Sequence, residues 1–163
     1  MRPAQAKRGG APVGFMAELD EVGATSVIYL RLWYDGPDGQ ASISDDLAMA
    51  LGLDQGERAF QSFANLCKLC AQHGRRPLMR HAINCKCLGA DEACFANFIE
   101  AAAQGEQEDA MLIATLMVRA NIAPMVASLA AEVGNAFGNM RFRMPQSSDS
   151  RAPAFYPEPT TLH

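Results

Sequence analysis

The sequence predicts a mainly α-helical fold, a compact bundle of about five to six helices with one short β element around residues 77–88. Three observations lead to this prediction. Apolar residues recur at helical spacing in several segments, acidic residues precede several of those segments, and the connectors are short. Hydrophobic residues make up 49% of the chain and charged residues 20%, as in a globular protein that buries a core. Short connectors imply that consecutive helices are antiparallel neighbours.

The two ends of the chain differ in composition from its middle. Residues 1–14 are small and basic, and residues 145–163 are rich in proline and serine. We expect both to be disordered tails that flank a single globular helical domain at 15–144. The first residues lack the apolar run of a signal peptide, and the longest apolar run, at 110–118, is too short to span a bilayer. The sequence therefore predicts a soluble cytoplasmic protein with no membrane partner.

Residues 16–35 have features of both a strand and a helix. The stretch SVIYLRLW has the β-branched and aromatic content of a strand. A helix is favoured because apolar and small residues recur at helical spacing, acids stand near the start, and Gly36-Pro37 follows as a stop signal. The next stretch, DGPDG, predicts a turn. A short helix capped by Ser44 or Asp45 is expected to run to about Leu53.

Residues 57–73 predict an amphipathic helix. Helical spacing places Phe60, Phe63, Cys67 and Cys70 on its apolar face, with Gly74 as a left-handed terminator. Residues 77–88 are expected to be either a strand or an irregular crossing. If they are extended, His81, Cys85 and Cys87 share one face because side chains alternate along a strand.

Three helices are expected after this crossing. The first is opened by Asp91 and Glu92 and stopped by Gly105, and the second runs from the acids at 106–109 to Arg119. The middle of the second, MLIATLMV, has no polar side, so we expect it to be the central buried helix with Leu112 and Leu116 in the core. The third is amphipathic and runs from after Asn121 to about Gly138. The paired acids are interpreted as helix starts and not as acid–base catalysts.

The stretch from residue 66 to 94 contains all five cysteines of the chain and two of its three histidines. Cys67-x-x-Cys70 and Cys85-x-Cys87 are 14 residues apart, within the range of four-cysteine zinc sites. His81, His73 or Cys94 could replace one ligand. In the alternative interpretation these cysteines pack as small buried hydrophobes, since Cys67 and Cys70 lie on an apolar helix face. A nucleophilic cysteine with His81 as its base is a third interpretation. We favour packing for Cys67, Cys70 and Cys94, and function for Cys85, Cys87 and His81.

The same stretch overlaps a basic segment. Residues 58–90 carry six Lys or Arg and no Asp or Glu, so they contribute +6 to a net charge of −4 and leave −10 for the rest. An acidic partner would suit this asymmetry, although a solvated face balanced by acids elsewhere is the simpler explanation. The expected partner-binding residues are Arg75, Arg76, Arg80 and Lys86.

The chain carries no Gly-x-Ser-x-Gly, no phosphate-binding glycine loop and no His-Glu-x-x-His, so no catalytic residue is assigned. We expect an intracellular, non-enzymatic interaction or regulatory module whose basic segment 58–90 faces an acidic partner. That partner is a protein or a second copy of the chain. Nucleic acid is less favoured because the rest of the chain is acidic. The alternative is a small zinc-binding protein in which the cluster at 67–94 holds a structural metal; apart from that zinc, no cofactor is expected.

Overall fold

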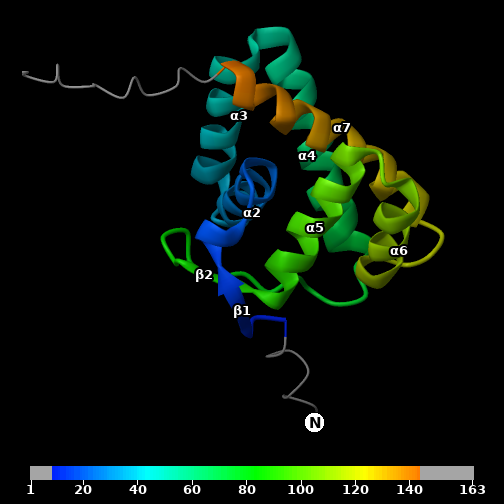
Figure 1. The fold of residues 1–163 in the computed structure, drawn as a ribbon. Coiled ribbons are helices and arrows are strands. Elements are labelled where there is room, and N and C mark those ends of the chain that lie inside the picture. The colour runs from blue at the N-terminus through cyan, green and yellow to red at the C-terminus, as the bar shows by residue number, and fades with distance from the viewer. Residues whose placement is uncertain (1–8, 144–163) are drawn as a thin grey trace, which may run out of the picture.

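The structure, a computed structural model, describes residues 9–143 and confirms the mainly helical fold class (Figure 1). Within that range there are six α-helices, one 3₁₀ turn and a two-stranded antiparallel sheet. Their bounds are β1 (Pro12–Phe15), η1 (Met16–Glu18), α2 (Glu21–Tyr34), α3 (Pro37–Leu51), α4 (Leu53–His73), β2 (Cys87–Gly89), α5 (Ala90–Gln104), α6 (Gln107–Met117) and α7 (Ala123–Arg143). None of these helices is long and apolar enough to cross a membrane. The expected C-terminal tail and most of the N-terminal one lie outside the described residues.

The hydrophobic core is centred on Phe63 of α4, which is fully buried. Its ring lies 6.0 Å from that of Tyr29 on α2, 6.5 Å from Phe95 on α5 and 6.0 Å from Phe137 on α7. Two of these contacts are edge-to-face, the arrangement that aromatic quadrupoles prefer. Four helices therefore converge on one aromatic cluster.

The helical interpretation of residues 16–35 agrees with α2, which starts after an N-cap in which Asp20 accepts a hydrogen bond from the Gly23 N–H at 2.7 Å. The turn expected at DGPDG is confined to its first two residues, Asp35 and Gly36, because α3 already begins at Pro37. Proline suits the first helical position, where its missing N–H is not needed. The helix expected from Ser44 or Asp45 is thus the second half of a longer one.

Two expectations at helix ends need correction. Gly74, which follows α4, is extended with φ −61° and is not left-handed. It pairs with Val118 in an isolated antiparallel bridge, so the chain leaves α4 in an extended direction. Helix α7 does not stop near Gly138 but continues to Arg143.

The expectation that 110–118 forms the central buried helix is wrong. In α6, Leu112 is 64% exposed and Leu116 is 67% exposed. The side that packs against α5 and α7 is formed by Ala110, Ala114 and Met117. Small residues allow close helix packing, and the bulkier leucines are left on the outer side. Helix α5, with Phe95, Phe98 and Ile99 fully buried, occupies the interior instead.

The β element is smaller than the stretch that the sequence indicated. Residues 77–86 are irregular, and only Cys87–Gly89 form β2. Its partner is β1, where Pro12 pairs with Gly89 and Phe15 with Cys87. Residues 12–14, which were expected to belong to a disordered tail, therefore form a strand. The Met16 N–H also donates to the Lys86 carbonyl at 2.9 Å, so the N-terminal segment lies along the chain that leads into β2.

Candidate functional site

The loop between α4 and β2, residues 74–86, crosses one end of the bundle and contains most of the residues that the sequence singled out (Figure 1). Its first residues are tied to the end of α6. The Arg75 N–H donates to the Met117 carbonyl at 3.0 Å, and the Arg119 N–H donates to the His73 carbonyl at 3.1 Å. We call this segment the 74–86 loop.

A buried ion pair holds the far end of this loop. Arg31 on α2 is 3% exposed and Glu92 on α5 is fully buried. Arg31 Nε lies 2.7 Å from Glu92 Oε1, and Nη2 lies 2.9 Å from Oε2, a two-pronged charge-assisted contact. The same guanidinium donates to the carbonyl oxygens of Cys85 at 2.7 Å and Cys87 at 2.8 Å. One arginine therefore joins two helices to the backbone of the loop and of β2.

Glu92 completes this anchor from the other side. Its Oε1 accepts from the His81 N–H and its Oε2 from the Gly89 N–H, both at 2.9 Å. Burial on its own raises the pKa of Glu92, but the hydrogen bonds from Arg31, Gly89 and His81 hold the pKa below its ordinary value. The carboxylate is charged, and its acceptor positions face protein donors.

Asp91, the residue before Glu92, holds the near end of the loop. It is 5% exposed and binds the guanidinium of Arg76, whose Nη1 lies 2.6 Å from Oδ2. The Met79 N–H donates to the same carboxylate at 2.7 Å. The hydrogen bond from Arg76 to the Asp91 carboxylate raises the pKa of Arg76. At Gly9 a Cβ atom would lie 2.1 Å from Asp91 Oδ2, so a residue without a side chain is needed where the N-terminal segment passes.

The other cations of the loop face outward. Arg75, Arg80 and Lys86 are all exposed. Arg75 Nε donates to the Thr115 carbonyl at 2.7 Å, and the Arg80 guanidinium lies 3.8 Å from the centroid of the Tyr34 ring. A cation over an aromatic face is attracted by the ring quadrupole, which favours one position for Arg80. Of the four expected partner-binding residues, Arg76 is thus paired with Asp91, while Arg75, Arg80 and Lys86 present charge at the surface.

The cysteines separate into two groups. Cys67 and Cys70 lie in the hydrophobic core at 1% and 5% exposed. Burial raises the pKa of Cys67 well above its ordinary value and raises that of Cys70 to about 12. Cys94 is half-buried, and burial raises its pKa too. Cys85 and Cys87 are partly exposed at the end of the loop.

The structure does not bring the predicted metal ligands together. Across residues 9–143, no group of three or more His, Cys, Asp or Glu side chains is arranged to hold a metal ion. It does bring together one pair from the expected set: Cys85 Sγ lies 3.6 Å from His81 Nδ1. The other ring nitrogen, His81 Nε2, lies 2.9 Å from the Gly10 carbonyl oxygen.

Sequence reasoning missed the anchors of the site. Arg31 lies in a segment that the sequence predicts only to be helical, and Asp91 and Glu92 are predicted only to start a helix. A signal was present, because Arg31 follows Val27 by four residues and so shares its buried side. A second signal was that Asp91 and Glu92 directly follow residues 58–90, which contain no Asp or Glu, so the two acids could find their counter-charges there.

Comparison with protein-family models, curated proteins and solved structures gives no match for this chain.

Proposed function

We propose that the protein is a non-enzymatic interaction module whose 74–86 loop binds an acidic segment of a partner protein. The observation that carries the proposal is that the acids beside the loop are buried, whereas three of its cations are exposed. Asp91 and Glu92 lie inside the fold at 5% and 0% exposed, whereas Arg75, Arg80 and Lys86 are exposed. The acids nearest to the loop in sequence are thus bound to Arg76 and Arg31 and do not neutralise the outer cations.

The fixed backbone of the loop supports the same proposal. Hydrogen bonds from Arg31 and to Glu92 and Asp91 hold the loop at residues 79, 81 and 85, and others hold β2 at residues 87 and 89. A loop that is already ordered loses little conformational entropy when it binds, so more of the contact energy appears as affinity. Arginine also suits carboxylates, because its planar guanidinium donates two parallel hydrogen bonds to one carboxyl group.

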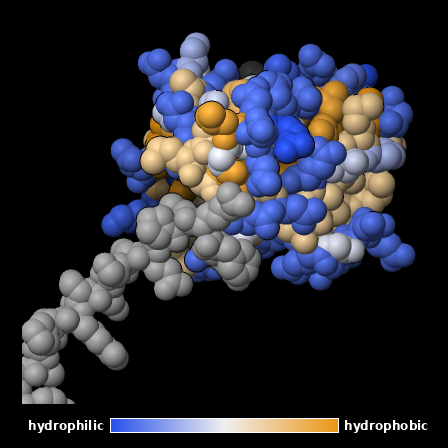
Figure 2. All heavy atoms as spheres, turned by 90° about the horizontal axis from the view of Figure 1, so that it is seen from above, coloured by the Kyte–Doolittle hydropathy of each residue, from blue (hydrophilic) through white to orange (hydrophobic). Residues whose placement is uncertain are grey.

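The opposite end of the bundle offers a contrast. Figure 2 shows that polar side chains cross the middle of its visible surface, with hydrophobic residues on both sides of them. Met49 and Leu53, at the junction of α3 and α4, are 88% and 81% exposed. Interaction sites driven by apolar burial usually show one larger contiguous patch. We choose the charged loop as the docking surface because its cations are exposed while the acids that follow it in sequence are buried.

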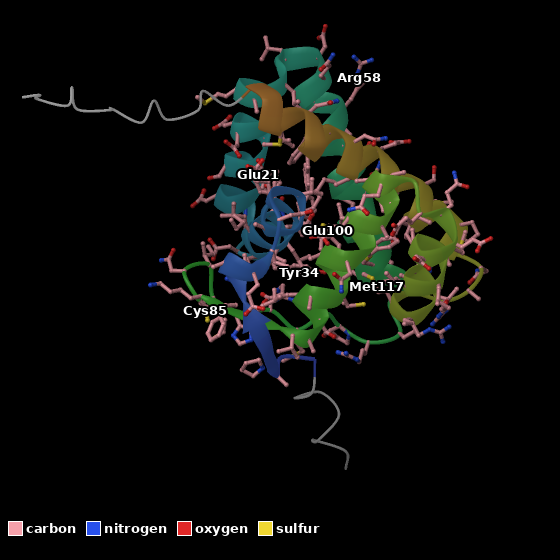
Figure 3. All side chains as sticks on the ribbon, in the orientation of Figure 1. Glu21, Tyr34, Arg58, Cys85, Glu100 and Met117 are labelled. Carbon is pink, nitrogen blue, oxygen red and sulfur yellow. The ribbon has the colours of Figure 1, made fainter. Side chains whose placement is uncertain are left out.

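The test is binding of a fluorescent decaglutamate peptide, followed by anisotropy at two salt concentrations. Reversing two loop charges, Arg80→Glu with Lys86→Glu, is expected to weaken binding about tenfold or more, since each exposed pair contributes up to about 1 kcal/mol. The matched control is Arg58→Glu with Lys68→Glu on the exposed side of α4, which changes the net charge by the same amount. Figure 3 places Arg58 at the far end of the bundle from Cys85.

Equal weakening by the two double variants would refute a specific loop site, because it would mean that only the total charge matters. Binding that does not weaken as salt rises would also refute it. A DNA duplex is titrated in parallel. Tighter binding to the duplex than to the peptide would contradict a protein partner and favour nucleic acid.

A further inference from the structure

Cys85 and His81 form a thiol–imidazole pair at the end of the 74–86 loop that the interaction function does not use. Cys85 is partly exposed, and its Sγ lies 3.6 Å from His81 Nδ1. Figure 3 shows Cys85 at the outer edge of the molecule, beside β2. We propose that Cys85 is a reactive thiol with His81 as its base, and that hydroperoxides oxidise it to a sulfenic acid.

The hydrogen bonds of His81 assign the roles of its two nitrogens. The Gly10 carbonyl oxygen can only accept, so Nε2, 2.9 Å away, carries the proton of the neutral ring. Nδ1 then has a free lone pair directed at Cys85 and can take the thiol proton. A nucleophile, a base and a group that orients the base are the three parts that activated nucleophiles share.

The position of the imidazole is fixed from several sides. The backbone N–H of His81 donates to Glu92 Oε1 at 2.9 Å, so the buried ion pair between Arg31 and Glu92 holds the backbone of His81. A Cβ atom at Gly89 would lie 3.0 Å from His81 Cδ2, so the ring packs closely against β2 where a glycine leaves space.

The position of Cys85 is fixed as well. Its N–H donates to the Ala82 carbonyl at 2.9 Å, and its own carbonyl accepts from Arg31 Nη1 at 2.7 Å. Cys85 and His81 therefore lie on one stretch of backbone that Arg31 and Glu92 hold in place, which keeps the sulfur beside its base.

The proposed reaction needs a hydroperoxide and no cofactor. The thiol proton moves from Sγ to His81 Nδ1, and the thiolate attacks one peroxide oxygen. The S–O bond forms as the O–O bond breaks, and the leaving oxygen takes the proton from Nδ1. With hydrogen peroxide the products are one sulfenic acid and one water, so sulfur is oxidised by two electrons and the peroxide is reduced by two. His81 returns to its neutral form.

The other cysteines supply internal comparisons. Cys67 and Cys70 are buried in the core, and burial also raises the pKa of Cys94. Cys87 is partly exposed two residues from Cys85. Within residues 9–143, Cys85 is the cysteine whose thiol lies within hydrogen-bond distance of a histidine.

The first arm of the test is alkylation of the intact protein with iodoacetamide at pH 7, with each thiol followed by peptide mass spectrometry. Cys85 is expected to react about tenfold or more faster than Cys87, since a positioned base contributes at least that much. His81→Gln can still donate to the Gly10 carbonyl but cannot take a proton, and it should remove this advantage. His73→Gln, which changes the histidine at the end of α4, should leave the Cys85 rate unchanged.

The buried thiols report whether a variant stays folded. If Cys67 and Cys70 stay protected in His81→Gln while Cys85 becomes slow, the loss belongs to the base and not to unfolding. If they become reactive, the comparison of Cys85 with Cys87 in the unchanged protein decides instead. Equal rates for Cys85 and Cys87 there, or an unchanged Cys85 rate in a folded His81→Gln variant, would overturn the proposal.

The second arm uses hydrogen peroxide with dimedone, a reagent that traps sulfenic acid. A dimedone adduct is expected on Cys85, reduced in His81→Gln and absent in Cys85→Ser. Fast alkylation of Cys85 without a dimedone adduct would overturn the assignment of hydroperoxides as the substrate class. Neither arm depends on the acidic-partner proposal, since the decaglutamate peptide is absent from both.

Discussion

Replacing Glu92 by glutamine tests the anchor on which the arrangement of the loop depends. Glu92 accepts four hydrogen bonds, two from Arg31 and one each from the N–H groups of His81 and Gly89. Glutamine keeps the shape but offers one oxygen, so its NH₂ group would face donors. The Arg31 guanidinium would remain buried at 3% exposed without a counter-charge.

Loss of one partner of a buried ion pair costs about 3–5 kcal/mol, because the other charge is left uncompensated. The total stability of a domain is about 5–15 kcal/mol, so Glu92→Gln should lose a large share of it. Urea unfolding followed by circular dichroism measures the difference. Glu108→Gln, an exposed acid in the first turn of α6, is the matched control and should cost less than about 1 kcal/mol.

The double variant Arg31→Met with Glu92→Met removes both charges. It should be more stable than Glu92→Gln, since no unpaired charge is buried. A loss below about 1 kcal/mol for Glu92→Gln would refute the reasoning, because the pair would then contribute no more than an exposed one.

Three further predictions concern stability, packing and metal. Burial and the neighbouring Asp20 raise the pKa of Glu100 to about 7. The folded state therefore favours the protonated form of Glu100. The contribution of Glu100 to the free energy of unfolding is largest below about pH 4.5 and is lost as pH rises through 7. Discounted for solvent screening, the loss of stability is about 1 kcal/mol. The urea midpoints at pH 5 and pH 8 should therefore differ less in the Glu100→Gln variant than in the unchanged protein. Leu112→Ala and Leu116→Ala should each cost less than about 0.5 kcal/mol, whereas Leu30→Ala, in the core, should cost about 2–5 kcal/mol; a core-sized loss at Leu112 would contradict its exposure. Dialysis against a chelator should leave the melting temperature unchanged, and a fall accompanied by release of one zinc per chain would contradict the separation of Cys67 and Cys70 from Cys85 and Cys87.

Local sequence signals were sufficient where a helix has one clear apolar face and clear ends. The register of α4, with Phe63, Cys67 and Cys70 inward, follows from helical spacing alone. The start of α5 at its acids and its stop at Gly105, which is left-handed, follow from capping rules. These features depend on residues within one or two turns of each other.

Features that depend on distant residues were not predictable in this way. The middle of helix α6 is apolar on every side, so periodicity cannot tell which side is buried. The small size of Ala110 and Ala114 decides it through close packing. Arg31 and Glu92 are 61 residues apart, and no spacing rule connects them. His81 and Cys85 were expected to share one face only if residues 77–88 formed a strand. The structure has the other expected alternative, an irregular crossing, and brings the two side chains together there.

We propose that the 74–86 loop is a fixed surface with its cations outward and its neighbouring acids inward. The most direct measurement is an NMR titration of the ¹⁵N-labelled protein with the decaglutamate peptide at low salt. The account predicts that amide signals of Arg75, Arg80 and Lys86 shift progressively, while those around Arg58 at the far end of α4 stay in place. Shifts spread evenly over the surface, or confined to helices away from the loop, would contradict it.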